Sequence, residues 1–250
     1  MASPLPSRIR ACLFDLDGVL TQTATVHAAA WKRTFDELLA ARSRRTGTAC
    51  RPFTDDDYRT YVDGRIRTDG VRAFLASRDI TLPDGAPDDP PERATVHGVA
   101  NRKNALLLEE IDRHGVETFA DAVHLLHDVH AAGLPCAVVS ASANTARVLE
   151  VTGLADLVTA RIDGVVAHER RLRGKPAPDI FLAGAEALGV EPAAAAVFED
   201  AVAGVAAGHE GRFGLVVGVD RVGDGHADDL RQAGADVVVA DLGALRDALT

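Results

Sequence analysis

The segment Ile9-Arg10-Ala11-Cys12-Leu13-Phe14-Asp15-Leu16-Asp17-Gly18 sets the architecture of the chain. Its mostly apolar first six residues give way at once to two acids and a glycine, a pattern typical of a buried strand that ends in a turn. Short runs rich in Val or Ala recur late in the chain, at residues 136–140, 195–198, 214–219 and 235–239. We predict that all five runs are strands of one sheet.

Helical segments lie between the late strands, at residues 121–132, 144–150, 178–188 and 202–209. Strands that alternate with helices form βαβ units, which build a parallel sheet covered by helices on both faces. The predicted fold class is therefore α/β, with a doubly wound, Rossmann-like parallel sheet as its core. Such sheets bind ligands at the carboxyl ends of their strands.

Residues 23–118 interrupt this alternation, because they carry apolar stripes at helical spacing and no strand pattern. The stripes are Trp31-Phe35-Leu38-Leu39, Val71-Phe74-Leu75 and Leu107-Leu108-Ile111. Gly115 follows the third stripe as an expected helix C-cap, and residues 81–92, which contain four prolines, are expected to be a loop. We predict a core domain of residues 1–22 and 119–250, and an inserted α-helical domain of residues 23–118.

The composition excludes several classes of protein. Among 250 residues, 47% are hydrophobic and 26% are charged, which is typical of a folded globular chain. There are 27 Lys and Arg residues against 37 Asp and Glu residues and no basic run stands out, which argues against nucleic acid or an anionic membrane as a partner. No segment reaches the ~18 apolar residues of a membrane span. Three cysteines form no disulfide framework, so we expect a cytoplasmic protein.

Asp15 and Asp17 are the first candidates for chemistry. With one residue between them at a strand end, their carboxylates can flank one reacting group, so that one attacks while the other moves a proton. The alternative is a simple turn after a strand. Asp55 and Asp57 show the same spacing in a polar stretch that no strand precedes.

Three further polar clusters follow other predicted strands or begin the helices after them. Residues 140–144 open a helix, whose free N–H groups suit a phosphate, although Ser142 could simply cap that helix. Lys175 lies between a glycine and a proline, either as a solvated charge or as a cation for a phosphoryl group. Glu199 and Asp200 are adjacent acids after a buried strand, and a hard cation such as Mg²⁺ would relieve their repulsion. All four clusters fall on one edge of the predicted sheet.

Together these segments resemble the four motifs of the haloacid dehalogenase superfamily, and more narrowly its β-phosphoglucomutase-like branch. The resemblance covers nearly the whole chain. Thr23, His27 and residues 101–104 also resemble the cap domain of that branch. The matching motifs are Leu13–Thr21, Ser140–Asn144, Gly174–Pro178 and Phe198–Gly204.

The resemblance implies a role for each core residue. Asp15 would be the nucleophile that becomes an aspartyl phosphate, and Asp17 the general acid and base. Mg²⁺ would be held by the Asp15 carboxylate, the Asp17 backbone carbonyl, and Glu199 or Asp200. The metal and a lysine would screen the repulsion between carboxylate and phosphate.

Phosphate contacts are also implied by the resemblance. Ser140, Ala141 and Lys175 would bind the transferring phosphoryl group, and Asn144 the distal phosphate.

In the cap, the resemblance implies that His27, Arg65 and Arg67 contact the substrate. Arg67 matches the arginine that binds the non-reacting phosphate. Asp63 stands where the sugar-phosphate mutases carry a lysine, and Arg65 is the candidate to replace that lysine. Two further departures are Gln22 for a usual Asp and Ala143 for a usual Lys.

The leading functional hypothesis is a Mg²⁺-dependent β-phosphoglucomutase that converts β-glucose 1-phosphate into glucose 6-phosphate. The alternative within the same fold is a phosphatase that hydrolyses a small sugar phosphate. A third reading, a response-regulator receiver, would need about half this length, no helical insertion and no proton-shuttling Asp17. We expect a monomer whose partner is a small phosphorylated sugar. His124, His127 and His130 repeat every three residues along a helix and are expected to be solvated.

Overall fold

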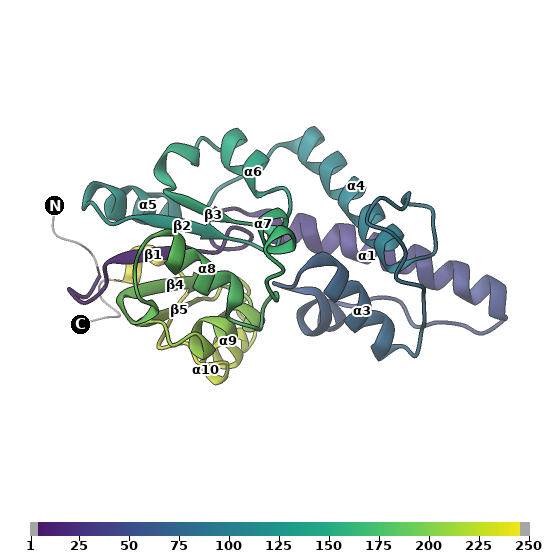
Figure 1. The fold of residues 1–250 in the computed structure, drawn as a ribbon. Helices are drawn as coiled ribbons and strands as arrows, with labels where there is room; N and C mark the ends of the chain where they lie inside the picture. The colour runs from purple at the N-terminus through teal and green to yellow at the C-terminus, as the bar shows by residue number, and fades with distance from the viewer. Residues whose placement is uncertain (1–4, 246–250) are drawn as a thin grey trace. The chain divides into compact units, whose positions relative to one another are not determined.

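The computed structural model describes residues 5–245. Within this part of the chain, six parallel strands form one sheet in the order β3-β2-β1-β4-β5-β6 (Figure 1). The sequence order reverses between β1 and β4, which is the point where doubly wound sheets bind ligands. The strands are β1 Ala11–Phe14, β2 Cys136–Val139, β3 Ala160–Ile162, β4 Ala195–Glu199, β5 Leu215–Val219 and β6 Val237–Val239.

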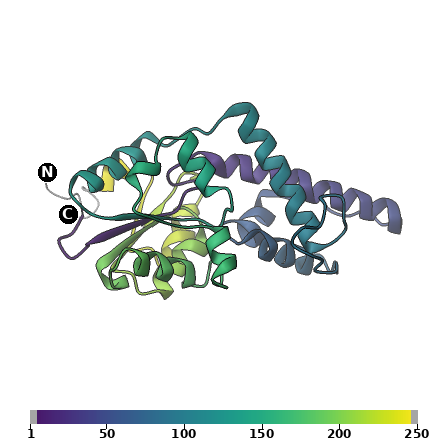
Figure 2. The same ribbon diagram turned by 45° about the horizontal axis from the view of Figure 1, so that its top comes forward.

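Helices cover both faces of this sheet. Helices α5 (Ala120–Ala131) and α6 (Thr145–Val151) lie on one face, and α8 (Asp179–Ala187), α9 (Val202–Glu210) and α10 (His226–Gln232) lie on the other (Figures 1 and 2). Every residue of β1, β2, β4 and β5 is buried, which explains why these strands are continuous apolar runs instead of alternating ones. The predicted α/β, doubly wound parallel fold is confirmed.

Three elements of the core were not predicted. Strand β3 has only three residues at the edge of the sheet, and Arg161 at its centre is exposed, so no apolar run marks it. Helices α7 (Gly164–Glu169) and α10 have six and seven residues, too short to show an apolar stripe. Short 3₁₀ turns complete the core at Ala155–Leu157, Pro192–Ala194 and Leu242–Ala244.

Thr23–Gly115 form a second compact unit. It contains α1 (Thr23–Thr46), α2 (Asp55–Asp57), a π-helical turn (Tyr58–Val62), α3 (Arg67–Ser77) and α4 (Val96–His114). The first two apolar stripes meet in one core around four aromatic rings, and the start of α4 adds Val96, Val99 and Ala100 to it. The Phe35 ring centroid lies 5.1 Å from that of Trp31, 5.1 Å from that of Phe53 and 4.1 Å from that of Phe74. Gly115, with φ 73°, ends α4 as predicted.

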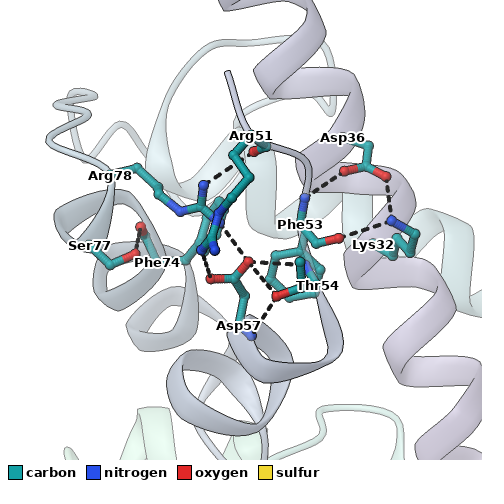
Figure 3. Close-up of polar contacts among 9 residues, drawn as sticks. All are labelled: Lys32, Asp36, Arg51, Phe53, Thr54, Asp57, Phe74, Ser77 and Arg78. Carbon is teal, nitrogen blue, oxygen red and sulfur yellow. Dashed lines mark hydrogen bonds and ion pairs between the residues drawn. The ribbon is translucent and has the colours of Figure 1, made fainter. Parts of the chain in front are cut away.

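A buried carboxylate, Asp57, ties the loop before α2 to the end of α3 in this unit (Figure 3). Its oxygens accept from the Thr54 backbone N at 3.0 Å, from Arg51 Nη2 at 3.4 Å and from Arg78 Nη2 at 2.5 Å. Asp36 Oδ1 accepts from the Phe53 backbone N at 2.8 Å on the other side of the loop. These contacts explain how Asp57 is buried although it belongs to a polar stretch.

The predicted boundary at residue 118 is wrong by three residues. Residues 116–118 belong to the core unit, since the Gln22 backbone N donates to Glu117 O at 2.8 Å and Thr21 forms an antiparallel bridge with Thr118. The segment that leads into the insertion, at Thr21, therefore lies beside the segment that leads out of it, at Thr118. Between residues 5 and 245, no helix combines the length and the apolar character that a membrane crossing requires.

Candidate active site

Four polar clusters gather at the carboxyl ends of β1, β2 and β4. The rings of Phe14 and Phe198, at equal register in β1 and β4, stack at a centroid distance of 4.5 Å. The Asp15 backbone N then donates to Phe198 O at 2.9 Å, so β1 and β4 stay paired up to the loops that follow them. Ser140 follows β2 directly, and Glu199 is the last residue of β4. The parallel register thus brings Asp15, Ser140 and Glu199 to one edge.

Lys175 lies at the centre of this edge with a fully buried side chain. Its Nζ donates to Asp15 Oδ1 at 2.5 Å, to the Glu199 carboxylate, and to the Val139 carbonyl at 3.4 Å. The ammonium also lies 4.9 Å from the centroid of the Phe181 ring. The reading of Lys175 as a solvated surface charge is therefore wrong.

Two buried carboxyl groups share this one ammonium, and the pKa values of Asp15 and Lys175 show the consequence. Burial raises the pKa of Asp15, the carboxylates of Glu199 and Asp17 raise it further, and Lys175 opposes them, so that the pKa is well above its usual range. For Lys175, burial alone would lower the pKa, but the charges of Asp15 and Glu199 outweigh burial and raise it. The Lys175 ammonium therefore keeps its charge, but it does not fully balance the negative charge of the acids around Asp15.

The turn after β1 positions Asp17 beside Asp15. The Asp17 backbone N donates to Asp15 Oδ2 at 2.8 Å, and the Gly18 backbone N donates to Thr21 O at 2.8 Å, which closes the turn. Ser140 Oγ donates to Asp17 Oδ2 at 3.2 Å. The Ser140 hydroxyl, which follows β2, therefore holds the Asp17 carboxylate, which follows β1.

Two glycines make room for the acids of the fourth cluster. A Cβ on Gly18, whose φ is +96°, would overlap with the Asp200 carboxylate, and a Cβ on Gly204 would overlap with the Glu199 carboxylate. The Glu199 side chain can turn towards Lys175 because α9 presents only a hydrogen atom at Gly204. Neither requirement was predicted, because both contacts depend on the folded geometry.

The loop after β2 is built from its own side chains. The Ser142 backbone N donates to Ser140 Oγ at 3.0 Å, and the Asn144 backbone N donates to Ser142 Oγ at 3.2 Å. Ala141, which is half-buried, lies between the two serines. Helix α6 begins at Thr145 after Asn144, without a side-chain cap, so the reading of Ser142 as a simple helix cap is wrong.

The donor set at this edge fits a hard divalent cation. Among residues 5–245, no group of three or more His, Cys, Asp or Glu side chains is placed to hold a metal by itself, so a backbone oxygen is needed as well. Both oxygens of Glu199 already accept protein donors, Lys175 at Oε1 and the Ala201 backbone N, at 2.8 Å, at Oε2. Oxygen-only donors and a surplus of negative charge are what Mg²⁺ requires. The acids at this edge that could contribute side chains are Asp15, Glu199 and Asp200.

The predicted cap residues lie in the inserted unit. Arg67 begins α3, burial lowers its pKa, and its buried Nε has no hydrogen-bond partner within residues 5–245. Arg65, which is half-buried, donates from Nη2 to Thr60 O at 3.5 Å. His27 Nδ1 lies 3.1 Å from Nζ of Lys103, a buried lysine of the segment 101–104 that resembles the cap domain.

Comparison with known proteins gives the family. The profile described as "haloacid dehalogenase-like hydrolase" matches residues 9–211. This chain belongs to the haloacid dehalogenase-like hydrolases. It is 56% identical over 243 residues to a β-phosphoglucomutase of Mycobacterium bovis, which covers 96% of this chain and 93% of that protein. It is 29% identical over 202 residues to hexitol phosphatase A of Escherichia coli, which covers 80% and 79% of the two chains.

A solved haloacid dehalogenase-like structure agrees with the fold. The β-phosphoglucomutase of Clostridium difficile superimposes with a TM-score of 0.73 at 25% identity, covering 95% of this chain and 93% of that one. The chain is therefore an enzyme of this family, a phosphomutase or a phosphatase. The response-regulator reading is wrong, because the likeness extends through the helical insertion.

Proposed function

We propose that this chain is a Mg²⁺-dependent β-phosphoglucomutase that works through an aspartyl phosphate on Asp15. The observation that carries the chemistry is the buried contact of Lys175 with Asp15 and Glu199, beside Asp17. The 56% identity to the M. bovis β-phosphoglucomutase supports the choice of substrate. The site residues carried over from the family resemblance keep their roles in this proposal.

The Asp15 carboxylate is the nucleophile. One of its oxygens attacks phosphorus while the bond from phosphorus to the sugar oxygen breaks, and the leaving oxygen takes a proton from Asp17. Lys175 and the Ser140 hydroxyl contact the transferring phosphoryl group and balance its charge. Mg²⁺, which Asp15, the Asp17 backbone carbonyl and Asp200 would hold, would supply further positive charge to the phosphoryl transfer. In this proposal Asp200 is the metal ligand of that pair, and Glu199, whose carboxylate accepts from Lys175, orients Lys175.

A mutase cycle uses the same residues twice. Phosphorylated Asp15 gives its phosphoryl group to the 6-hydroxyl of β-glucose 1-phosphate while Asp17 takes the hydroxyl proton. The resulting bisphosphate turns around, Asp15 attacks the 1-phosphoryl group, and Asp17 returns the proton to the sugar oxygen. Glucose 6-phosphate leaves, and Asp15 is phosphorylated again.

The inserted unit supports a substrate with two phosphates. The half-buried Arg67, whose buried Nε lacks a partner within residues 5–245, is proposed to bind the non-reacting phosphate. His27, fixed by its contact with Lys103, and Arg65 are proposed to contact the sugar phosphate. A mutase must also keep water from the phosphoaspartate until the sugar arrives.

Hydrolysis of a sugar phosphate is the second candidate. The relation to hexitol phosphatase A favours it, as does Asp63 at the position of the mutase lysine. In that reaction, water replaces the sugar hydroxyl as the acceptor from phosphorylated Asp15, and Asp17 takes the proton of the water.

One assay separates the two candidates. Purified protein with MgCl₂ is given β-glucose 1-phosphate, and glucose 6-phosphate and inorganic phosphate are followed together, with α-glucose 1-phosphate as the matched control. We expect glucose 6-phosphate from the β anomer alone, accelerated by a trace of glucose 1,6-bisphosphate. Stoichiometric inorganic phosphate without isomer would overturn the mutase and leave the phosphatase.

A further inference from the structure

A buried histidine outside the four motifs contacts the loop that carries Asp200. His226 is the first residue of α10, only 7% of its surface is exposed, and its Nε2 lies 2.7 Å from the backbone oxygen of Asp200. Because a carbonyl oxygen only accepts, Nε2 carries the proton and donates it. The two residues are 26 positions apart in the chain, so no local sequence pattern reveals the contact.

This hydrogen bond completes a clamp on a single peptide unit. The carbonyl of the Asp200–Ala201 peptide accepts from His226, and the N–H of the same peptide donates to Glu199 Oε2 at 2.8 Å. A peptide unit is planar, so two bonds at its opposite edges fix its orientation. This peptide carries the Cα of Asp200, whose carboxylate lies against Gly18 in the turn after Asp17.

The loop that carries His226 is itself held in place. Asp220 Oδ1 accepts from the backbone N of Val222 at 3.1 Å and of Gly223 at 2.7 Å. Gly225 adopts φ 87°, in the left-handed region that turns the chain into α10. His226 is therefore presented from a defined turn.

The second ring nitrogen of His226 argues against a role in packing alone. Nδ1 is buried and has no hydrogen-bond partner among residues 5–245. Such a buried acceptor carries a cost that an apolar side chain would avoid. This cost is borne by an imidazole whose other nitrogen, Nε2, contacts the backbone oxygen of Asp200.

From these contacts we infer that His226 is a positioning residue for the proposed Mg²⁺ site, which it serves by orienting the Asp200–Ala201 peptide. The inference rests on the proposed function, in which Asp200 is a metal ligand. Outer groups that orient metal ligands typically contribute ~10–100-fold to metal affinity. His226 does not touch the reacting atoms, so its effect falls on Mg²⁺ affinity before it falls on sugar-phosphate affinity.

The test measures Mg²⁺ binding directly, by isothermal titration calorimetry of the full chain without sugar phosphate. In His226→Leu, an apolar side chain fills the space of the imidazole and offers no hydrogen-bond donor. In His226→Gln, an amide N–H lies near the position of Nε2. The exposed His127, on α5 of the same unit, provides the control His127→Ala. Melting curves in EDTA establish that each variant is folded, and His226→Asn, whose amide stops short of Asp200, replaces the leucine variant if that variant does not fold.

We expect the Mg²⁺ dissociation constant of His226→Leu to rise by ~10-fold or more, while His226→Gln and His127→Ala stay within about threefold of the wild type. The KM for sugar phosphate at saturating Mg²⁺ should stay close to that of the wild type. Wild-type Mg²⁺ affinity in His226→Leu, or an equal loss in His226→Gln, would overturn the positioning role alone. A wild-type chain that binds no Mg²⁺ would overturn the proposed metal site, and the positioning role with it.

Discussion

Asp17 differs from the other acids of the site in its partner. Asp15 and Glu199 contact the Lys175 ammonium, whereas Asp17 Oδ2 accepts a neutral hydrogen bond from Ser140 Oγ at 3.2 Å. A carboxylate that accepts from a hydroxyl is suited to exchange a proton with a sugar oxygen. This difference in partners supports the separate roles proposed for Asp15 and Asp17.

The change Asp17→Asn tests the proton-transfer role. The amide oxygen can still accept from Ser140, so we expect the melting temperature and Mg²⁺ binding to stay near those of the wild type, while kcat falls by ~10²–10⁴-fold. Asp55→Asn, at an exposed acid with the same Asp-x-Asp spacing, is the matched control. Steady-state kinetics with β-glucose 1-phosphate provide the measurement. An unchanged kcat would remove Asp17 from that role.

A second residue-scale prediction concerns the glycine behind Glu199. Gly204→Ala places a methyl group on the Glu199 carboxylate, so the side chain must leave Lys175 or the helix must shift. We expect the free energy of unfolding to fall by ~1–3 kcal/mol, the usual range for overpacking, and turnover to fall with it.

Gly208→Ala, one helical turn later in α9, is the graded control for this change. There the added methyl group meets Val197 and Val216 at 3.3 Å, and no member of the site. Urea denaturation and kinetics of the two variants should show a smaller stability loss and near-normal turnover for Gly208→Ala. Equal turnover losses would show that Gly204 has no particular relation to Glu199.

At the scale of elements, an ion pair connects the loop after β5 to the start of α5. Arg221 Nη2 donates to Asp121 Oδ2 at 2.8 Å, and the same oxygen accepts from the Leu242 backbone N at 2.7 Å. Arg221 also lies 4.1 Å from the centroid of the Phe119 ring. This cluster fastens the loop from which α10 and His226 begin.

The stability contributed by Asp121 depends on pH. Burial alone would raise the pKa of Asp121, but the Leu242 N–H and the Arg221 guanidinium outweigh burial and lower it. A lowered native-state pKa means that the contribution is present above the unfolded-state pKa of ~3.9 and is lost as the pH falls through the native value. We expect Asp121→Asn to cost ~1–3 kcal/mol of unfolding free energy at pH 7, and the difference from the wild type to shrink below about pH 4.

Urea denaturation at pH 7 and at pH 3.5 checks this prediction, with Asp128→Asn as the control at an exposed acid of α5. The control should match the wild type at both pH values. A difference between Asp121→Asn and the wild type that grows on acidification would contradict the assigned pKa direction.

The elements show which parts of the molecule the sequence could predict. The strands at the centre of the sheet are buried on both faces and appear as apolar runs, so β1, β2, β4 and β5 were predicted almost at their observed bounds. Strand β3 was not predicted, because an edge strand with an exposed Arg161 has no such apolar run. Asp57 looked like part of a solvated stretch, because its buried state depends on Arg78, 21 residues away.

The same distinction between local patterns and long-range contacts applies to the candidate site. Asp15, Ser140, Lys175 and Glu199 could be placed from the sequence because each follows or ends a strand or precedes a helix, and parallel strands bring such positions to one edge. The side-chain pairing could not be placed. That Glu199 faces Lys175, that Gly204 makes room for it, and that His226 reaches Asp200 are long-range contacts that no local pattern carries.

At the scale of the whole molecule, the proposal places the chemistry in the core unit and assigns substrate contacts to residues of the inserted helical unit. The core unit holds the proposed nucleophile, the proton-transfer residue and the metal ligands, and the inserted unit holds Arg67 and His27. Both candidate functions use the same phosphorylated Asp15 and differ only in the acceptor. The phosphoryl-enzyme is therefore the central claim.

Rapid acid quenching during turnover, followed by peptide mass spectrometry, tests that claim most directly. We predict a phosphoryl group on the peptide that contains Asp15, formed within the first turnover in the presence of Mg²⁺ and absent from Asp15→Asn, which should also lack turnover. Continued turnover without any protein-bound phosphoryl group, or a phosphoryl group on another residue, would contradict the account.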